Sequence, residues 1–365
     1  MEVLVENLCG ITAAQVIMWC ISGVLIYLAI GKKMEPALLL PMGFGAILVN
    51  LPKSGAAAVL GRLYEIGIAD NELFPLLLFL GIGAMIDFTP LLRAPGLMLF
   101  GAAAQFGIFF TLGLASLLGF ELKDAASIAI IGAADGPASI FVAQTLNCRY
   151  TAAILVAAYS YMALVPIVQP PIIRLCTTRA ERRIRMQDKG RPVSKRTRIL
   201  FPIIVTGIVG LAAPGAVALI GFLMFGNLIR ECGVLNTLSE TAQNVLANLI
   251  TLLLGITVAA RMSAEEFLRA ETLLILGLGL VAFVMDTVGG ILLAKLLNLF
   301  RKEKLNPMIG AAGISAFPMS ARVVHKLGRE EDNQNFLLMS AVGVNVSGQI
   351  ASVIAGGLIL ALVGG

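Results

Sequence analysis

The chain repeats itself at one nearly constant spacing, and each copy carries a glycine-rich break inside a membrane-length apolar segment. The stretch 36–40 (PALLL) recurs at 214–218 (PGAVA), and 131–134 (IGAA) recurs at 309–312, so both pairs are 178 residues apart. A third match, of NELFPLLLFLGIGAMID with NVLANLITLLLGITVAAR, falls between these two landmarks at nearly the same spacing. Three matches in one order indicate an internal duplication of the kind found in ion-coupled carriers.

The composition indicates that lipid surrounds most of the 365 residues. Hydrophobic residues make up 58% of the chain and charged residues 13%, whereas charged residues are about 25% of a typical soluble domain. Apolar stretches of about 17–25 residues, the length that crosses the hydrocarbon core as a helix, recur from one end to the other. Because a barrel would show alternating polarity instead, we expect an all-α polytopic membrane protein. The five cysteines are scattered and are interpreted as small core residues.

The apolar segments predict six membrane-inserted segments in each half of the chain. In the first half they are 11–30, 36–52, 72–92, 97–119, a glycine-broken segment at 124–146, and 150–173. In the second half they are 199–212, 214–229, 241–260, 270–294, a broken segment at 306–324, and 334–363. The first repeat is therefore placed at 1–176 and the second at 199–365, with a linker at 177–198.

The linker region carries the excess positive charge of the chain. Residues 174–198 hold ten Lys or Arg against two acidic residues, a local charge of +8, whereas the net charge of the whole chain is +5. A nucleic-acid-binding patch is one interpretation of such a run. Since short loops between membrane spans carry Lys and Arg on the cytoplasmic side, we place the linker in the cytoplasm instead.

The number of crossings in each half determines how the two repeats are related. If each broken segment enters and leaves on one side, each half crosses the bilayer five times, and an odd number inverts the second half. Basic residues then fall at the predicted inner ends, among them Lys32, Arg93, Arg230 and Arg301. We therefore expect inverted repeats whose discontinuous, re-entrant helices meet near the bilayer midplane. Full crossings of both broken segments would give parallel repeats, which is the alternative.

Asp135 is the leading candidate for a functional side chain. It lies at the centre of an apolar run and is followed by Gly136 and Pro137, which unwind a helix. A carboxylate in the middle of a membrane segment costs about 2.5–3.5 kcal/mol, so it needs a cation, a proton or a base as partner. Unwinding also frees backbone carbonyls that can coordinate a hard cation. The alternative is an aspartate that only caps a half-helix.

Polar residues of the last apolar segment, together with one tyrosine, are expected beside this carboxylate. The repeat places Tyr161 and Asn345 at related positions in the two halves. The expected ion-binding residues are Asp135, Asn345, Ser347, Gly348 and Ser352. One carboxylate among neutral oxygens suits Na⁺ or a proton better than Mg²⁺ or Zn²⁺. The alternative is that these polar residues only hydrogen-bond one helix to another.

Other polar residues in apolar segments have weaker patterns. The secondary candidates are Ser139, Ser315 and Asp286. For Asp286 the possible partners are Arg261, Lys295 and Arg322. Asp87 precedes a Phe-Thr-Pro sequence near a predicted inner end, where a capping role is expected.

Two absences restrict the source of energy. The chain has no G-x-x-x-x-G-K-[ST] phosphate loop, and its single histidine, His325, leaves no recognisable Ser-His-Asp arrangement. The energy must therefore come from an ion gradient or from chemistry that a partner delivers.

Five stretches carry a resemblance to a known family. They are 79–88 (FLGIGAMIDF), 132–140 (GAADGPASI), 159–166 (YSYMALVP), 315–322 (SAFPMSAR) and 345–352 (NVSGQIAS). With them the chain resembles, over nearly its whole length, the β subunit of the biotin-dependent, Na⁺-pumping decarboxylases. That family includes oxaloacetate, glutaconyl-CoA and methylmalonyl-CoA decarboxylases.

The resemblance implies a reaction and a set of residues. Carboxybiotin carried on a separate subunit would be decarboxylated at this membrane subunit, with consumption of a proton and export of Na⁺. The resemblance implies a catalytic role for Asp135 and Tyr161, and Na⁺ binding at Asp135, Asn345 and Ser352. The implied cofactors are Na⁺ and the biotin of the other subunit.

The resemblance also implies partners and a location. The partners are a biotin carrier subunit, a carboxyltransferase α subunit and a small membrane-anchoring subunit, with a homo-oligomer in the complex and the cell inner (cytoplasmic) membrane as its site. The competing function is a stand-alone secondary carrier, either a Na⁺/H⁺ antiporter or a Na⁺-coupled organic-anion transporter. A non-catalytic scaffold subunit is a third possibility.

Overall fold

The computed structural model describes residues 6, 9–69, 72–186 and 192–364. Throughout these residues the regular structure is helical, and the predicted all-α class is confirmed. Residues 187–191 of the predicted linker lie outside the described residues, as do 1–5, 7–8, 70–71 and 365.

Seven helices of the described chain are long and apolar enough to cross a membrane, so the protein is a multi-pass membrane protein. They are Ala13–Gly31 (α2), Pro95–Leu117 (η2, α7 and α8), Thr151–Cys176 (α11), Pro214–Cys232 (η4 and α14), Asn236–Arg261 (α15, η5, α16 and η6), Ala270–Phe300 (α18) and Leu338–Val363 (α20). A bent pair, Ala56–Ala69 (α4 and η1) with Leu73–Met85 (α5), is an eighth candidate.

Some of these spans are interrupted within their length. The pieces are η2 (Pro95–Leu97), α7 (Met98–Ala104), α8 (Phe106–Leu117), η4 (Pro214–Ala216), α14 (Val217–Cys232), α15 (Asn236–Glu240), η5 (Thr241–Leu246), α16 (Ala247–Val258), η6 (Ala259–Arg261), α4 (Ala56–Tyr64) and η1 (Glu65–Ala69). The other elements outside the two broken segments are α3 (Pro36–Val49), which is a shorter apolar helix, α6 (Thr89–Arg93), α12 (Arg179–Arg182), α13 (Lys195–Ala212) and α17 (Ala264–Phe267).

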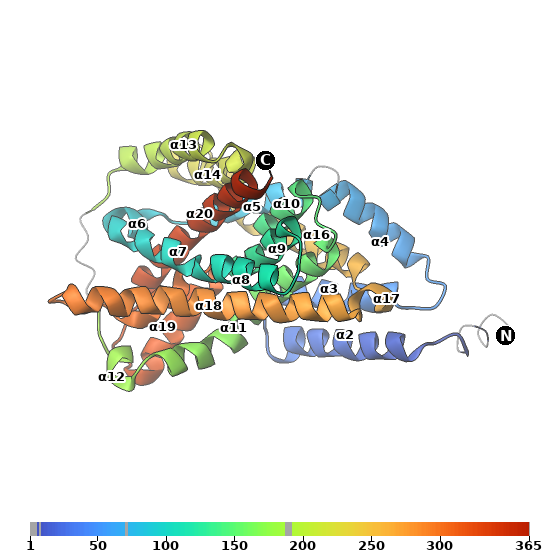
Figure 1. Ribbon diagram of the computed structural model, residues 1–365. Helices are drawn as coiled ribbons and strands as arrows, with labels where there is room; N and C mark the ends of the chain where they lie inside the picture. Colours follow the sequence, from blue (N-terminus) through green and yellow to red (C-terminus); the bar gives the residue numbers. More distant parts are fainter. Residues whose placement is uncertain (1–5, 7–8, 70–71, 187–191, 365) are drawn as a thin grey trace.

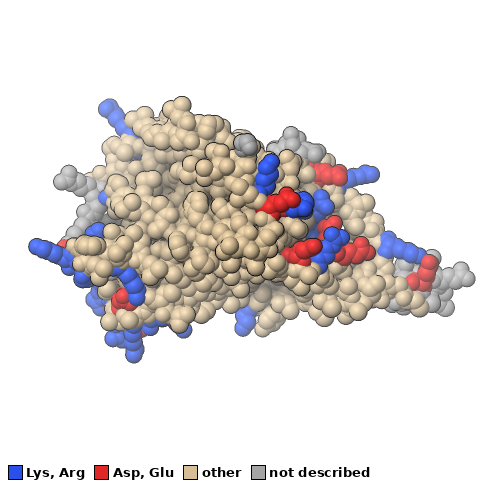
Figure 2. Space-filling model, viewed as in Figure 1, with Lys and Arg blue, Asp and Glu red and all other residues tan. Residues whose placement is uncertain are grey.

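The helices form an elongated bundle with two distinct ends. In Figure 1, α18 runs along most of its length, α2 and α3 lie together on one side, and α13 and α14 lie on another. Figure 2 shows that Lys, Arg, Asp and Glu gather towards the two ends, while uncharged side chains cover the middle of this face. An uncharged band between charged ends is the surface that a membrane-spanning bundle requires.

The contacts between helices come in corresponding pairs. Helix α2 packs on α3, and α13 packs on α14; α5 contacts α14, and α16 contacts α3. Both third segments also contain a π-helical turn, η1 in the first half and η5 in the second. This pairing is compatible with the predicted inverted repeats. Exchanging α3 with α14, and α5 with α16, turns the contact of α5 with α14 into the contact of α16 with α3.

Two asparagines show the same correspondence at the level of single hydrogen bonds. Asn50, which follows α3, donates to the carbonyl oxygen of Met262 at 2.8 Å. Asn227, in α14, donates to the carbonyl oxygen of Ile86 at 2.9 Å. Both side chains are buried. Each amide therefore satisfies a carbonyl of a buried residue at the end of a membrane segment in the opposite half.

Candidate ion-binding site

The first broken segment comprises α9 (Leu122–Ala129), the 3-10 turn η3 (Ile130–Ala133) and α10 (Gly136–Thr145). The chain turns at Ala134, whose φ of 51° is left-handed, and Asp135 is extended. Proline in the first turn of α10 favours a helix start here, since its missing N–H is not needed. The carboxylate of Asp135 accepts a hydrogen bond from the amide of Ala138 at 3.1 Å. The predicted break and the capping contact are therefore both present.

The second broken segment comprises η7 (Pro307–Gly313) and α19 (Met319–Glu331), with a non-helical stretch between them. The side chain of Asn306 caps η7 by accepting from the amide of Met308 at 3.1 Å. Gly310 lies so close to Gly290 of α18 that a Cβ on either would strike the carbonyl oxygen of the other. Only glycine at both positions allows η7 to lie directly on α18.

The breaks of the two segments meet. The amide of Ser315, in the non-helical stretch, donates to the carbonyl oxygen of Ala133 at 2.9 Å. This backbone contact joins the two halves of the chain two residues before Asp135. The two discontinuous helices therefore create one shared junction of unwound backbone.

One face of α20 lies against this junction. Asn345, Gln349 and Ser352 follow one another at intervals of four and three residues, which places them on the same side of a helix. Asn345 Nδ2 donates to the carbonyl oxygens of Ala312 at 3.1 Å and Ile314 at 2.7 Å. The three polar side chains thus reach from the second broken segment towards the first.

The end of this face reaches the carboxylate. Ser352 Oγ donates to Asp135 Oδ2 at 2.8 Å. Asp135 is 4% exposed and Ser352 is fully buried, and in the described chain the carboxylate takes part in hydrogen bonds but in no ion pair. A buried carboxylate with only neutral donors needs a proton or a cation to offset its desolvation.

Two buried side-chain oxygens of α20 at the junction have no donor among the described residues. The side-chain oxygens of Asn345 and Gln349 are both in this state, although their NH₂ groups are hydrogen-bonded. An unsatisfied buried acceptor costs about 1–3 kcal/mol. One carboxylate and neutral oxygens of this kind form a ligand set that suits a hard cation.

The other predicted residues fall into two groups. Ser139 Oγ donates to the backbone oxygen of Asp135 at 2.7 Å, and Ser315 Oγ donates to the carbonyl oxygen of Gly348 at 3.1 Å. Gly348 itself packs against the backbone of Gly313. These three residues thus support the junction. Ser347 instead points to η2, where its hydroxyl donates to the carbonyl oxygen of Leu97 at 3.1 Å.

The structure places a different tyrosine beside Asp135 from the one that the sequence favoured. The hydroxyl of Tyr161 donates to the backbone oxygen of Leu276 in α18. The ring of Tyr159 lies against Gly136, where an added Cβ would be 2.5 Å from it, and its buried hydroxyl has no partner in the described chain. Residues two apart on a helix face different directions, which is why the two tyrosines separate.

Asp286 occupies another position and has other partners than expected. Its Oδ1 accepts from the amides of Gly107 at 2.5 Å and Ile108 at 3.2 Å. These amides belong to the first turn of α8, just after the break between α7 and α8, where N–H groups have no helical partner. Of the basic residues named as possible partners, Lys295 instead pairs with Glu181 at 3.1 Å, and Arg261 lies over the ring of Tyr64. Asp87, by contrast, caps Thr89 as predicted, at 2.8 Å.

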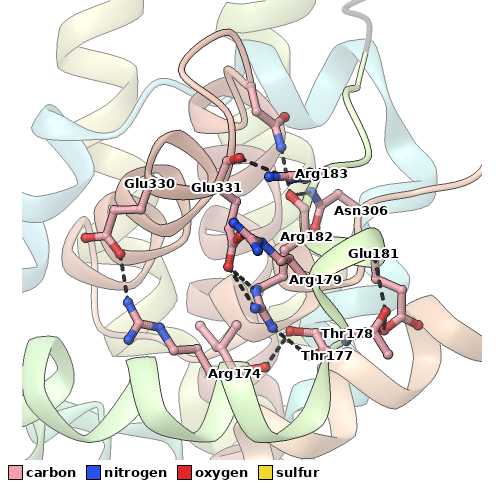
Figure 3. Close-up of polar contacts among 12 residues, drawn as sticks. Arg174, Thr177, Thr178, Arg179, Glu181, Arg182, Arg183, Asn306, Glu330 and Glu331 are labelled. Atoms are coloured by element: carbon pink, nitrogen blue, oxygen red, sulfur yellow. Dashed lines mark hydrogen bonds and ion pairs between the residues drawn. The ribbon is translucent and has the colours of Figure 1, made fainter.

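The basic linker is held to the end of α19 by ion pairs, shown in Figure 3. Arg182 of α12 pairs with Glu331 at 2.7 Å, and Arg174 of α11 pairs with Glu330 at 2.8 Å. The Arg182 guanidinium hydrogen-bonds the Glu331 carboxylate and, together with Arg179, lowers the pKa of Glu331. The local positive charge read from the sequence is therefore partly neutralised by acids of the second broken segment.

The cap of η7 is part of the same arrangement. Asn306 Nδ2 donates to the carbonyl oxygens of Arg182 at 2.9 Å and Ile184 at 2.8 Å.

A cavity of about 800 Å³ opens beside these linker residues. Its lining includes four basic side chains, Arg93, Arg185, Arg301 and Lys304. The lining also includes Leu97 and Phe100, whose carbonyls contact Ser347 and Gly313 respectively.

A polytopic helical bundle with a buried carboxylate at the junction of two broken helices defines a membrane protein of the ion-coupled class. Comparison with known proteins identifies the family within this class. The family model of the Na⁺-transporting oxaloacetate decarboxylase beta subunit matches residues 14–363. The chain belongs to this family.

Characterised relatives match along almost their whole length. The chain is 48% identical to the methylmalonyl-CoA decarboxylase subunit beta of Propionigenium modestum, over 97% of this chain and 96% of the relative. It is 47% identical to the glutaconyl-CoA decarboxylase subunit beta of Acidaminococcus fermentans, over 97% and 94%. It is 44% identical to the oxaloacetate decarboxylase beta chain of Klebsiella pneumoniae, over 95% of each. The predicted resemblance is confirmed, and the chain is a membrane subunit of a Na⁺-transporting decarboxylase.

Proposed function

We propose that this subunit decarboxylates carboxybiotin carried on a partner subunit, consumes one proton in doing so, and couples the reaction to Na⁺ export. The observation that carries the proposal is the buried Asp135 carboxylate, which has only neutral donors at the junction of the two broken helices. Family membership supports the decarboxylase role, and the donor set supports the ion.

In this proposal Na⁺ is the transported substrate, and it binds to Asp135, Asn345 and Ser352. The Asp135 carboxylate supplies the negative charge, and the unpaired side-chain oxygen of Asn345 supplies a neutral ligand. The hydroxyl oxygen of Ser352 is within hydrogen-bond distance of the carboxylate and can turn its lone pairs to the ion. Hard oxygen ligands of this kind match an alkali cation.

The chemical step requires a proton at the site. Decarboxylation breaks the bond between the biotin ring nitrogen and the carboxyl carbon, the electron pair stays on nitrogen, and a proton must be added there as CO₂ leaves. The Asp135 carboxylate cannot hold Na⁺ and a proton at the same oxygen. Exchange of one for the other at Asp135 would link proton consumption to release of the ion. In this proposal Tyr161 assists the relay once its hydroxyl leaves the carbonyl of Leu276.

The orientation of the subunit in the membrane is inferred from the charge of its two ends. We place the linker end in the cytoplasm of a cell with this protein in its inner membrane, because the basic residues gather there. The partners would be a biotin carrier subunit, a carboxyltransferase α subunit and a small membrane-anchoring subunit, with a homo-oligomer in the complex. Exporting one charge against 100 mV costs about 2.3 kcal/mol, so the coupling of decarboxylation to ion movement must be tight to be useful.

The test is carboxybiotin decarboxylation by the purified complex, with and without Na⁺, in the native protein and in Asp135→Asn. We expect Na⁺-stimulated CO₂ release that disappears in Asp135→Asn and remains in Asp87→Asn, whose carboxylate only caps Thr89. Native protein that binds Na⁺ but releases no CO₂, and that moves Na⁺ by itself in vesicles, would favour the stand-alone carrier.

A further inference from the structure

Gln349 lies in the middle of the polar face of α20, between Asn345 and Ser352. Its side chain is buried, with 3% of its surface exposed. Its Nε2 group donates to the backbone oxygen of Ser315. Ser315 is the residue through which the second broken segment contacts Ala133 of the first. The carboxamide of Gln349 is therefore anchored at the point where the two segments meet.

Anchoring the NH₂ group determines where the other end of the carboxamide points. Because Nε2 is committed to Ser315, Oε1 must face away from that carbonyl, and it has no donor in the described chain. Asn345, one turn earlier, has the same arrangement, with Nδ2 on two carbonyls and Oδ1 unpaired. In both neighbouring carboxamides the NH₂ group thus donates to the second broken segment, and the oxygen has no donor in the described chain.

The neighbour on the other side ties Gln349 to the carboxylate. Ser352 Oγ lies 2.8 Å from Asp135 Oδ2 and 3.1 Å from the backbone oxygen of Gln349. The hydroxyl therefore bridges the turn that carries Gln349 and the acid of the first broken segment. An oxygen left without a donor at such a place is costly unless a cation occupies it.

From these contacts we infer that Gln349 supplies a further neutral oxygen ligand to the cation held by Asp135, Asn345 and Ser352. The inference rests on the proposed function, since it adds a ligand to the same Na⁺ site. It gives the site a row of three side-chain oxygens from one helix face, opposite a single carboxylate.

The experiment measures Na⁺ binding directly, by equilibrium binding of ²²Na⁺ and by the rise in melting temperature with added NaCl, on the full-length protein purified in detergent. In Gln349→Met, which keeps the side-chain length and removes the oxygen, we expect Na⁺ affinity to fall about 10- to 100-fold. The matched control is Gln105→Met. Gln105 is also a buried glutamine with an unpaired oxygen, but its Nε2 donates to Gly101 within its own helical segment.

A second variant separates the oxygen from the anchoring NH₂ group. Gln349→Glu keeps the side-chain oxygen and replaces the NH₂ group that donates to Ser315 with a second oxygen. It should therefore still bind Na⁺ at pH 8, at least as tightly as Gln349→Met. Native Na⁺ affinity in Gln349→Met would overturn the inference. So would loss of Na⁺ binding in a Gln349→Glu protein that keeps its native melting temperature.

The failure of this inference differs from the failure of the proposed function. If native protein binds Na⁺, Asp135→Asn does not, and Gln349→Met binds normally, the Na⁺ site stands and Gln349 is not a ligand. If native protein shows no Na⁺ binding by either measurement, the proposed function fails together with the ligand assignment.

Discussion

Ser352 on the last helix donates a hydrogen bond of 2.8 Å to the carboxylate of Asp135, which caps a helix in the other half of the chain. The contact joins residues 217 positions apart. It makes the acid of the first broken segment depend on a hydroxyl of the second half. Any movement that separates α20 from α10 must break this bond, so the pair is a natural point at which ion binding and conformation are linked.

Replacing Ser352 by alanine should weaken Na⁺ binding without unfolding the protein. A hydrogen bond to a charged group contributes about 1.5–3 kcal/mol, so we expect roughly a tenfold or larger rise in the Na⁺ concentration for half-maximal decarboxylation. Ser347→Ala is the comparison, because that hydroxyl is on the same helix and donates to Leu97 instead. Equal effects of the two substitutions would mean that Ser352 acts only in packing.

Close backbone contact between η7 and α18 predicts a strong effect of one methyl group. Gly290→Ala places a Cβ against the carbonyl oxygen of Gly310, and backbone atoms cannot yield as a flexible side chain would. Overpacking costs about 1–3 kcal/mol and sometimes more, so we expect a lower melting temperature and less folded protein in size-exclusion chromatography. Gly277→Ala is the control on the same helix, since nothing lies within 4 Å of its added Cβ. A normal Gly290→Ala protein would show that η7 is free to shift.

Residues that act locally could be predicted from the sequence. The break at Asp135 was predictable because Gly136 and Pro137 determine the backbone around it, and the capping contact follows from the same two residues. Ser352, although 217 positions from Asp135, was expected beside it from the spacing of the polar residues on the last helix and from the family resemblance, and the two side chains are in contact. Its role as an ion ligand remains a prediction.

Residues whose direction depends on distant packing could not be predicted. The ring of Tyr159 packs on Gly136, whereas α11 as a whole packs on α10, α18 and α19, so the choice between Tyr159 and Tyr161 depends on tertiary contacts and is not local. For Asp286 the partners are backbone amides, which leave no mark in the sequence. Gln349 was missed although it lies one turn from Asn345, a spacing that would have identified it.

Acid should weaken the attachment of the linker to α19 through Glu331. The hydrogen bond from Arg182, with help from Arg179, lowers the pKa of Glu331 from its ordinary value of 4.5. A lowered folded-state pKa means that the stabilisation is present above pH 4.5 and is lost as pH falls through the lower value. Glu331→Gln should therefore reduce the melting temperature at pH 7, and its difference from native protein should shrink as the pH falls below 4.5.

The neighbouring acid provides a comparison for this effect. Glu330→Gln removes a carboxylate that meets Arg174 in an exposed pair, and exposed pairs contribute about 0–1 kcal/mol. We expect its change in melting temperature at pH 7 to be smaller than that of Glu331→Gln. A Glu331→Gln difference that stays constant as the pH falls from 7 to well below 4.5 would mean that packing, not charge, is responsible.

Asp286 should behave as a structural cap whose charge is dispensable. In Asp286→Asn one side-chain oxygen can still accept from the amides of Gly107 and Ile108, so folding and Na⁺-stimulated decarboxylation should be nearly native. Asp286→Leu leaves both amides buried without an acceptor, at about 1–3 kcal/mol each, and should lower the melting temperature sharply. Measuring melting temperature and Na⁺-stimulated CO₂ release in both variants shows whether Asp286 is needed for its acceptor oxygen or for its charge. A well-folded Asp286→Asn protein that no longer responds to Na⁺ would place Asp286 in the ion path, because asparagine keeps the size of the side chain and one acceptor oxygen but removes the negative charge.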